Sequence, residues 1–463
     1  MDDRSKVRTG LAAVAALCVV ATVPGPVGPA WAAPADGAGE ARPYRTAGTS
    51  VQGTGEAEGA PLLKPGRGYV DSIAGGGEKR HYSVQLDATS GAYVSAVAAP
   101  RPGAGVASYR DGLKVTLESP DGTICGNSDR KIEATGVAYP LADYAARQVA
   151  PGSVASCRKA GRYLVTVARP AGSQDPARWP LELRLMVEPP VKGGDKEQAP
   201  EGSWRTTLPD PPTGKARWRT GGTAFNDARP LSTGVWADQI RPGETHFYRV
   251  PVDWGQRLDA TAELSAAKTG GTAGVNDALG LRVFNPARGL TKKSSFVAYE
   301  GQEARTEVST IPVAYGNRTA RAEYSVRTTS FAGWYYLAVT VSPDVARFFD
   351  DVVPLTLRVR VSGTPKPGPT YDGDAVRAGF GLTDADRREA AQGPQTTDDA
   401  TGVRAGTDNG RLRMVGYVSY AVGGLLLLGL GGWTLAARRR APAAVAAAPG
   451  PGRHRRYGPP SSW

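Results

Sequence analysis

Cysteine, histidine and paired carboxylates are the residues of this chain whose types and spacing could do chemistry. The 463 residues include three cysteines, of which Cys18 lies in an apolar N-terminal stretch. Cys125 and Cys157 are the pair left in the rest of the chain, and we expect them to form a disulfide, as such a pair does in a secreted protein. A metal pair is the alternative, but no histidine cluster accompanies it to complete a zinc site.

A catalytic histidine would have to be His81 or His246, since His454 falls in a basic C-terminal tail. Both precede a tyrosine by one or two residues in similar phrases, which favours a structural strand position. If the cysteines are bonded, no thiol is left for Cys–His catalysis. Adjacent acids such as Asp350 and Asp351 could act on glycosides only at a suitable separation in space. We therefore predict no enzyme activity, no catalytic residue and no cofactor.

Metal and sugar binding are the remaining site chemistries. Asp121 and Asp129, like the two acids above, stand in neither an EF-hand nor a nonapeptide calcium pattern, so turn formation is favoured and no metal site is predicted. Trp254, in the phrase VDWGQ, is the candidate ligand-binding residue, because an exposed indole can stack on a sugar.

Five phrases recur in the same order, about 165–174 residues apart, which indicates a duplicated domain. YVDSIAGGGEKRHYSVQLD returns as WADQIRPGETHFYRVPVD, and GAYVSAVA answers GQRLDATA. GLKVTLESPDG, AGRYLVTV and WPLELRLMV are matched by GLRVFNPARG, AGWYYLAV and VPLTLRVRV.

Within each phrase apolar residues alternate with polar ones, as in a half-buried strand. Leu181, Leu183 and Leu185 share one face, while Glu182 and Arg184 share the other, which we expect to be wet. Turn formers separate the phrases, and no helical stripe is sustained between them. The pattern predicts a mainly β fold of two tandem jelly-roll-like antiparallel β-sandwiches, plus one C-terminal transmembrane helix.

The order of phrases, with SPDG and AGRY intact in the first repeat, resembles the bacterial pre-peptidase C-terminal domain. This resemblance implies a small β-sandwich of secreted hydrolases and surface proteins. The second repeat, with TGGTAFNDA and RPGETHFYRVPVDWGQ, is also similar to the region that follows von Willebrand type A domains in some secreted actinobacterial proteins. The metal-adhesion motif of such domains does not occur in this chain, so metal-dependent adhesion is not carried over.

Two apolar segments predict where the chain resides. Basic residues, the stretch Leu11–Val23 and the small-residue site ending at Ala32 form a signal peptide, with cleavage after Ala32. Met414–Ala437 contains 24 residues without a charge, about 36 Å of helix against a hydrocarbon core of about 30 Å. Arg438, Arg439 and Arg440 follow at once, so the tail is expected in the cytoplasm and the ectodomain outside. Half of the net charge of +12 comes from six arginines of this tail, so nucleic acid is not predicted as a partner.

Linkers rich in Pro and Gly separate these units, and a short helix is expected near Asp384–Gln392 within the stalk. The predicted organisation is signal peptide 1–32, N-terminal extension 33–59, first sandwich 60–190, linker 191–218, second sandwich 219–363, stalk 364–413, transmembrane helix 414–437 and basic tail 438–463.

These features together predict a non-enzymatic, single-pass type I membrane protein of an actinobacterium, located in the cell membrane with its ectodomain outside. Its sandwiches are expected to bind a protein partner in the cell envelope. The alternative is binding of cell-wall glycan, and a lesser alternative is an accessory role for a hydrolase. The glycines of the membrane segment leave a homodimer possible.

Overall fold

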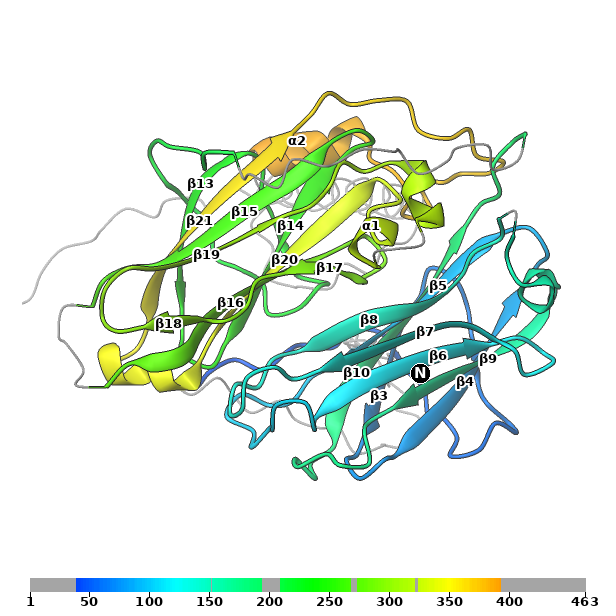
Figure 1. Ribbon diagram of the computed structural model, residues 1–463, viewed down its shortest axis with the longest axis horizontal. Coiled ribbons are helices and arrows are strands. Elements are labelled where there is room, and N and C mark those ends of the chain that lie inside the picture. Colours follow the sequence, from blue (N-terminus) through cyan, green and yellow to red (C-terminus); the bar gives the residue numbers. More distant parts are fainter. Residues whose placement is uncertain (1–38, 151, 194–208, 268–272, 321–323, 393–463) are drawn as a thin grey trace, which may run out of the picture. The chain divides into compact units, whose positions relative to one another are not determined.

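A computed structural model describes residues 39–150, 152–193, 209–267, 273–320 and 324–392, and this part of the chain is mainly β. Four sheets form two sandwiches, shown in blue to cyan and in green to yellow in Figure 1. No helix among the described residues is long and apolar enough to cross a membrane. The predicted signal peptide, transmembrane helix and basic tail lie outside the described residues.

The first sandwich pairs two five-stranded sheets. One sheet has the order β1 (Thr49–Ser50), β3 (Gly68–Ile73), β10 (Trp179–Glu188), β5 (Gly91–Ala98) and β8 (Leu141–Arg147). The other has the order β2 (Leu62–Leu63), β4 (Lys79–Leu86), β9 (Gly161–Ala168), β6 (Gly112–Glu118) and β7 (Ile124–Lys131). The sequences 3-10-5-8 and 4-9-6-7 are the strand order of a jelly roll.

The second sandwich repeats this order. One sheet runs β11 (Arg217–Trp218), β13 (Gly234–Ile240), β21 (Val353–Ser362), β15 (Arg257–Leu264) and β19 (Ala304–Ser309). The other runs β12 (Arg229–Pro230), β14 (Thr245–Val252), β20 (Gly333–Val341), β16 (Val275–Phe284) and β17 (Leu290–Lys293), with β18 (Val297–Tyr299) also paired to β16.

The register of the strands confirms the internal repeat. Tyr69 lies opposite Leu183 in the first sandwich, and Trp236 lies opposite Leu357 in the second, as the aligned phrases require. Alternation produces the core of each sandwich, because the apolar residues of one strand all face the opposing sheet. Before the predicted boundary at residue 60, β1 pairs with β3, and the Gly53 amide donates to Asp71 of the first sandwich.

The prediction of a wet face on β10 is wrong. Glu182 and Glu188 are buried, because this face of the first sandwich packs on the second. Val97, Ala99 and Ala142 meet a group of aromatic and small residues contributed mainly by β14, β16 and β20: Phe225, Phe247, Phe284, Tyr336 and Ala338. The two inner sheets are therefore covered on both faces.

The helical elements are short: the 3-10 helices Ala155–Arg158, Tyr315–Thr319 and Pro343–Phe348, and the helices α1 (Tyr324–Arg327) and α2 (Asp384–Gln392). The helix α2 matches the predicted range. A capping box explains where it begins, since Asp386 N donates to Thr383 Oγ1 at 3.1 Å and Thr383 N donates to Asp386 Oδ2 at 2.7 Å.

The predicted stalk is described up to Gln392, and this part is not an extended spacer. Tyr371 pairs with Val191 and donates its hydroxyl to Glu188 Oε1 at 2.8 Å. Further along, α2 lies against β14, where Arg249 forms an ion pair with Glu389 at 2.7 Å. Apolar and ionic contacts thus hold residues 364–392 against both sandwiches.

Candidate functional site

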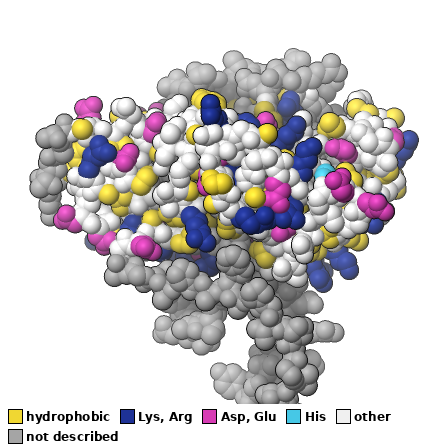
Figure 2. Space-filling model, turned by 90° about the horizontal axis from the view of Figure 1, so that it is seen from below, with side chains coloured by type: hydrophobic (Ala, Val, Ile, Leu, Met, Phe, Trp, Pro, Cys, Tyr) yellow, Lys and Arg dark blue, Asp and Glu magenta, His cyan; other side chains and the backbone are white. Residues whose placement is uncertain are grey.

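The surface carries charges of both signs rather than one extended field. On the face shown in Figure 2, basic and acidic side chains are interspersed among apolar and other polar groups, and no deep hollow is visible. Many of the basic side chains in the described part of the chain form ion pairs with acidic ones, such as Arg42 with Glu244 and Arg387 with Asp384. This neutralisation agrees with the expectation that net charge alone does not define a ligand.

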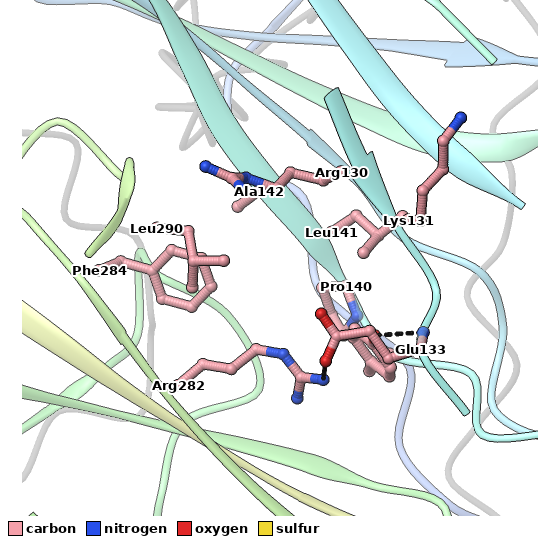
Figure 3. Close-up of a pocket in the computed structure, with 10 residues that line it drawn as sticks. Arg130, Lys131, Glu133, Pro140, Leu141, Ala142, Arg282, Phe284 and Leu290 are labelled. Carbon is pink, nitrogen blue, oxygen red and sulfur yellow. Dashed lines mark hydrogen bonds and ion pairs between the residues drawn. The ribbon is translucent and has the colours of Figure 1, made fainter. Parts of the chain in front are cut away.

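A small pocket lies where the two sandwiches meet (Figure 3). Its volume is about 20 Å³, on the order of one water molecule, so a sugar ring does not fit. Arg282 lines it with its guanidinium 3.8 Å from the centre of the Tyr139 ring, and Glu133 Oε2 lies 3.7 Å from Arg282 Nη2. Phe284 and Leu290 supply the apolar side of the pocket.

A buried cluster of charged and polar side chains lies inside the second sandwich. Asp238 occupies an inward position of β13, between the core residues Trp236 and Ile240. His246, on the facing strand β14, places Nδ1 2.6 Å from Asp238 Oδ2 and Nε2 2.8 Å from Glu244 Oε2. We call Asp238, Glu244, His246 and Tyr248, together with Arg42, the histidine cluster.

The remaining contacts complete the hydrogen bonding of the histidine cluster. The Tyr248 hydroxyl donates to Asp238 Oδ2 at 2.5 Å, and the Gly221 amide donates to the same oxygen at 2.9 Å. Arg42 donates to Glu244 Oε1 from its backbone nitrogen at 2.8 Å and from Nε at 3.1 Å. These donors satisfy the carboxylate oxygens, as burial of polar groups requires.

The pKa values in the histidine cluster follow from these contacts. Burial opposes ionisation of Glu244, but hydrogen bonds from His246 and Arg42 outweigh it and place the Glu244 pKa at about 2. Burial also disfavours the charged form of His246, yet Asp238 and Glu244 outweigh burial and raise the His246 pKa. Protonated His246 can donate one hydrogen bond to each carboxylate.

The first sandwich has a related arrangement. Tyr82 donates to Asp71 Oδ2 at 2.7 Å, and the Gly53 amide donates to the same oxygen at 2.8 Å. Arg80 stands at the position of His246, two residues before the tyrosine, and forms an ion pair with Glu78 at 2.8 Å. The sequence signal for these buried sites is an aspartate at a core-facing position, which occurs in YVDSI and again in WADQI. It was missed because a single acid in a strand ordinarily faces solvent.

The structure confirms one predicted site and leaves another as a prediction. Cys125 and Cys157 form a disulfide, with Cα atoms 5.5 Å apart. Only 9% of the surface of Trp254 is exposed to solvent, and its carbonyl accepts a hydrogen bond from Lys366 N at 2.9 Å. Gly368 lies so close to the indole that a Cβ there would overlap it, so a ligand could reach this ring only if the covering segment moved.

The acids and the other histidine considered from the sequence form contacts of their own and are not gathered into one site. Asp121 accepts hydrogen bonds within its own turn, including one from Thr123 Oγ1 at 2.9 Å, and Asp351 pairs with Arg241 at 3.1 Å. His81 contacts Thr166 at 3.0 Å. Among the described residues, no three histidine, cysteine or acidic side chains are grouped so that they could hold a metal ion.

One exposed aromatic residue was missed in the sequence. Trp218 on the edge strand β11 is 59% exposed, whereas Trp179 and Trp236 are buried. Arg217 and Arg219 flank it in the phrase KARWR and stack on Trp236 at 3.9 and 5.0 Å. The alternation of arginine and tryptophan was the available signal, but it did not indicate which of the tryptophans in the described part of the chain is exposed.

Comparisons with known proteins place the chain in no family. No family model matches it, and no curated protein matches it, so the resemblance to the pre-peptidase C-terminal domain stays a prediction. Solved structures with some likeness include the CBM22-1–CBM22-2 tandem domain of Xyn10C from Paenibacillus barcinonensis, at 14% identity and a TM-score of 0.20, covering 71% of this chain and 98% of that one.

Two others are the tandem CBM51 modules of the family 98 glycoside hydrolase Sp3GH98 from Streptococcus pneumoniae and the ANXUR2 extracellular domain from Arabidopsis thaliana. The first has 9% identity and a TM-score of 0.17, covering 63% of this chain and 84% of that one. The second has 10% identity and a TM-score of 0.18, covering 65% and 86%. Scores this low carry no argument about function.

Proposed function

We propose that the protein is a non-enzymatic binding protein of a bacterial cell envelope, with its sandwiches outside the cell and the segment 414–437 in the membrane. Its ligand is a cell-wall glycan that carries acidic groups. The observation that supports this ligand class is Trp218, an exposed ring on a sheet edge, with Arg217 and Arg219 next to it in the chain on the other face of the strand. Sugar rings bind on such a surface without a preformed cavity, and exposed apolar rings commonly mark interaction sites.

The charges around Trp218 support an acidic ligand. Arg217, Arg219 and Arg229 form no ion pair with any carboxylate among the described residues. Burial and the neighbouring charges of Arg217 and Arg229 lower the pKa of Arg219, in that order of importance. A carboxylate or phosphate of the ligand would relieve this repulsion, and guanidinium groups bind both in a bidentate manner.

Cosedimentation of the full-length protein, solubilised in detergent, with purified cell walls tests this proposal. We expect Trp218→Ala to weaken binding by about tenfold, equivalent to about 1.4 kcal/mol. Tyr109→Ala is the matched control, because Tyr109 is 75% exposed but lies on the first sandwich. Walls stripped of their acidic polymers should bind less. Equal binding by the wild type and Trp218→Ala would reject the site.

A protein partner is the second candidate, and it is favoured by a different surface. Ile124 and Val154 are 57% and 56% exposed, and they flank the disulfide on the first sandwich. Each residue lies close in sequence to a cysteine of the bridge, and exposed aliphatic side chains can contribute to a protein contact. Crosslinking in living cells, followed by mass spectrometry, should yield a stoichiometric partner that is lost with Ile124→Asp plus Val154→Asp and retained with Trp218→Ala.

A further inference from the structure

Each sandwich has a cationic or titratable side chain two residues before the buried tyrosine of the aligned strand, and the two side chains differ in kind: Arg80 contacts one carboxylate and His246 contacts two. In the first sandwich Arg80 lies next to Glu78 and donates from Nη1 to the Gly53 carbonyl at 2.8 Å. In the second, His246 lies between Asp238 and Glu244. Arginine keeps its charge at every physiological pH, whereas histidine changes charge near neutrality. The positive charge at this position is therefore permanent in the first sandwich, whereas in the second it depends on pH.

His246 is so closely surrounded by protein that its charge strongly affects the energy of the histidine cluster. The residue is fully buried, and a Cβ placed on Gly221 would come within 2.7 Å of the His246 Cβ and 2.9 Å of its ring. A change of one charge in such a site is screened far less than at the surface.

The segment of residues 40–48, which we call the strap, joins the histidine cluster to the other sandwich. Arg42 binds Glu244, and its Nη2 lies 2.7 Å from His246 Nε2. Tyr44 then packs on Phe247 with ring centres 5.7 Å apart, and its hydroxyl donates to Glu182 of the first sandwich at 3.2 Å. Whatever loosens the Arg42 end therefore acts on a contact between the sandwiches.

We propose that His246 is a pH-sensitive latch: its protonated form holds the strap and the surrounding turns closed on the second sandwich, and loss of its proton opens them. The charged and titratable groups directed at it are Asp238 from β13, Glu244 and Tyr248 around β14, and Arg42 from the strap. Asp227 also acts on Arg42.

The charge balance gives the direction of the latch. With His246 protonated, two cations, Arg42 and His246, face two carboxylates, and both imidazole nitrogens donate. Without the proton, one buried negative charge is uncompensated. The lone pair of Nε2 can then accept from Arg42 Nη2 at 2.7 Å, but it also faces Glu244 Oε2 at 2.8 Å, and these two acceptors repel each other. An uncompensated charge is costly to keep away from water, so hydration of the cluster is favoured.

The raised pKa of His246 agrees with this direction. A group whose pKa is higher in the folded state binds its proton more tightly there, so it stabilises the fold below the ordinary histidine value of about 6.5. This stability is lost as the pH rises from about 6.5 through the raised folded value.

Thermal unfolding of the detergent-solubilised full chain at a series of pH values tests the latch. We expect the Tm of the wild type to fall by about 2–4 °C between about pH 6 and pH 9 because of His246. Hydrogen exchange of residues 40–48, corrected for the intrinsic rate at each pH, should increase over the same range.

Three variants separate the latch from general effects of pH. His246→Arg introduces the permanent cation that the first sandwich has at this position. His246→Gln removes the titratable group without adding a charge. Whatever its absolute stability, each variant should lose the part of the fall in Tm between about pH 6 and pH 9 that is due to His246. Arg80→His should create a second pH-dependent fall, in the first sandwich. If both His246 variants keep the pH profile of the wild type, or if strap exchange is independent of pH in the wild type, the latch does not exist.

Discussion

Glu182 and Arg288 form an ion pair between the sandwiches with almost no access to water, at side-chain exposures of 1% and 3%. Glu182 also accepts hydrogen bonds from Tyr44, from the Ala47 amide at 3.2 Å and from Asn226 Nδ2 at 2.9 Å. A buried pair of this kind contributes little net stability, but the loss of one partner leaves a charge in a poorly solvated site. We therefore expect that replacing one partner of this pair destabilises the protein more than replacing both.

Arg288→Met tests this asymmetry. We expect the single change to lower the free energy of unfolding by about 3–5 kcal/mol, because the Glu182 carboxylate stays buried without its cation. Adding Glu182→Gln should restore part of the loss, because the uncompensated charge is then removed. Urea unfolding of both variants measures the coupling. Strictly additive losses would show that the charges do not interact.

At the scale of elements, the disulfide ties β7 to the turn before β9. Cys125 and Cys157 are 32 residues apart, and Arg147 braces the same region by donating to the Asp87 carbonyl at 2.7 Å. The chain-entropy model assigns a loop of this length about 3–4 kcal/mol, through restriction of the unfolded chain. The bridge therefore adds a covalent link to a sandwich that is otherwise held by its apolar core, by hydrogen bonds between strands and by ion pairs such as Arg169–Asp111.

Replacement of both cysteines by alanine should lower the free energy of unfolding by about 3–4 kcal/mol without moving the strands. Urea unfolding provides the measurement, and circular dichroism of the folded variant provides the control. Reduction of the wild-type protein should reproduce the loss. An unchanged urea midpoint would mean that the unfolded chain is already restricted in this region.

At the scale of the whole molecule, the described residues form one compact unit that contains both sandwiches. Tyr93 of the first sandwich packs on Phe331 of the second with ring centres 5.1 Å apart, and Phe380 from the predicted stalk packs on both. Arg318 of the second sandwich pairs with Glu188 of the first at 2.6 Å. An interface with a shared apolar core couples the stability of the two sandwiches.

Calorimetry should therefore show one unfolding transition for the two sandwiches, with similar calorimetric and van't Hoff enthalpies. Gly289→Ala is the matched perturbation, because a Cβ at Gly289 would overlap the Tyr144 ring across the interface. We expect this variant to split or broaden the transition. Two separate peaks in the wild type would contradict the coupling.

Much of the fold could be predicted from the sequence. The alternation in phrases such as WPLELRLMV identified strands, and five ordered matches identified two copies of one domain. The Cys125–Cys157 pair followed from the cysteine count, and α2 followed from the helix-forming residues of the stretch Asp384–Gln392. The candidate site was less predictable: the aspartate in WADQI becomes informative only when β13 and β14 face one another.

The sequence by itself determined which residues share a face of each strand, because the side chains of a strand alternate by geometry. Only the tertiary structure decided what covers each face. Glu182 was expected in water and lies in an interface. Trp254 was expected at a surface and lies beneath residues 364–368, whereas Trp218, which the sequence did not single out, is exposed. The physical reason is that burial depends on contacts between segments far apart in the chain, and alternation within one segment carries no information about them.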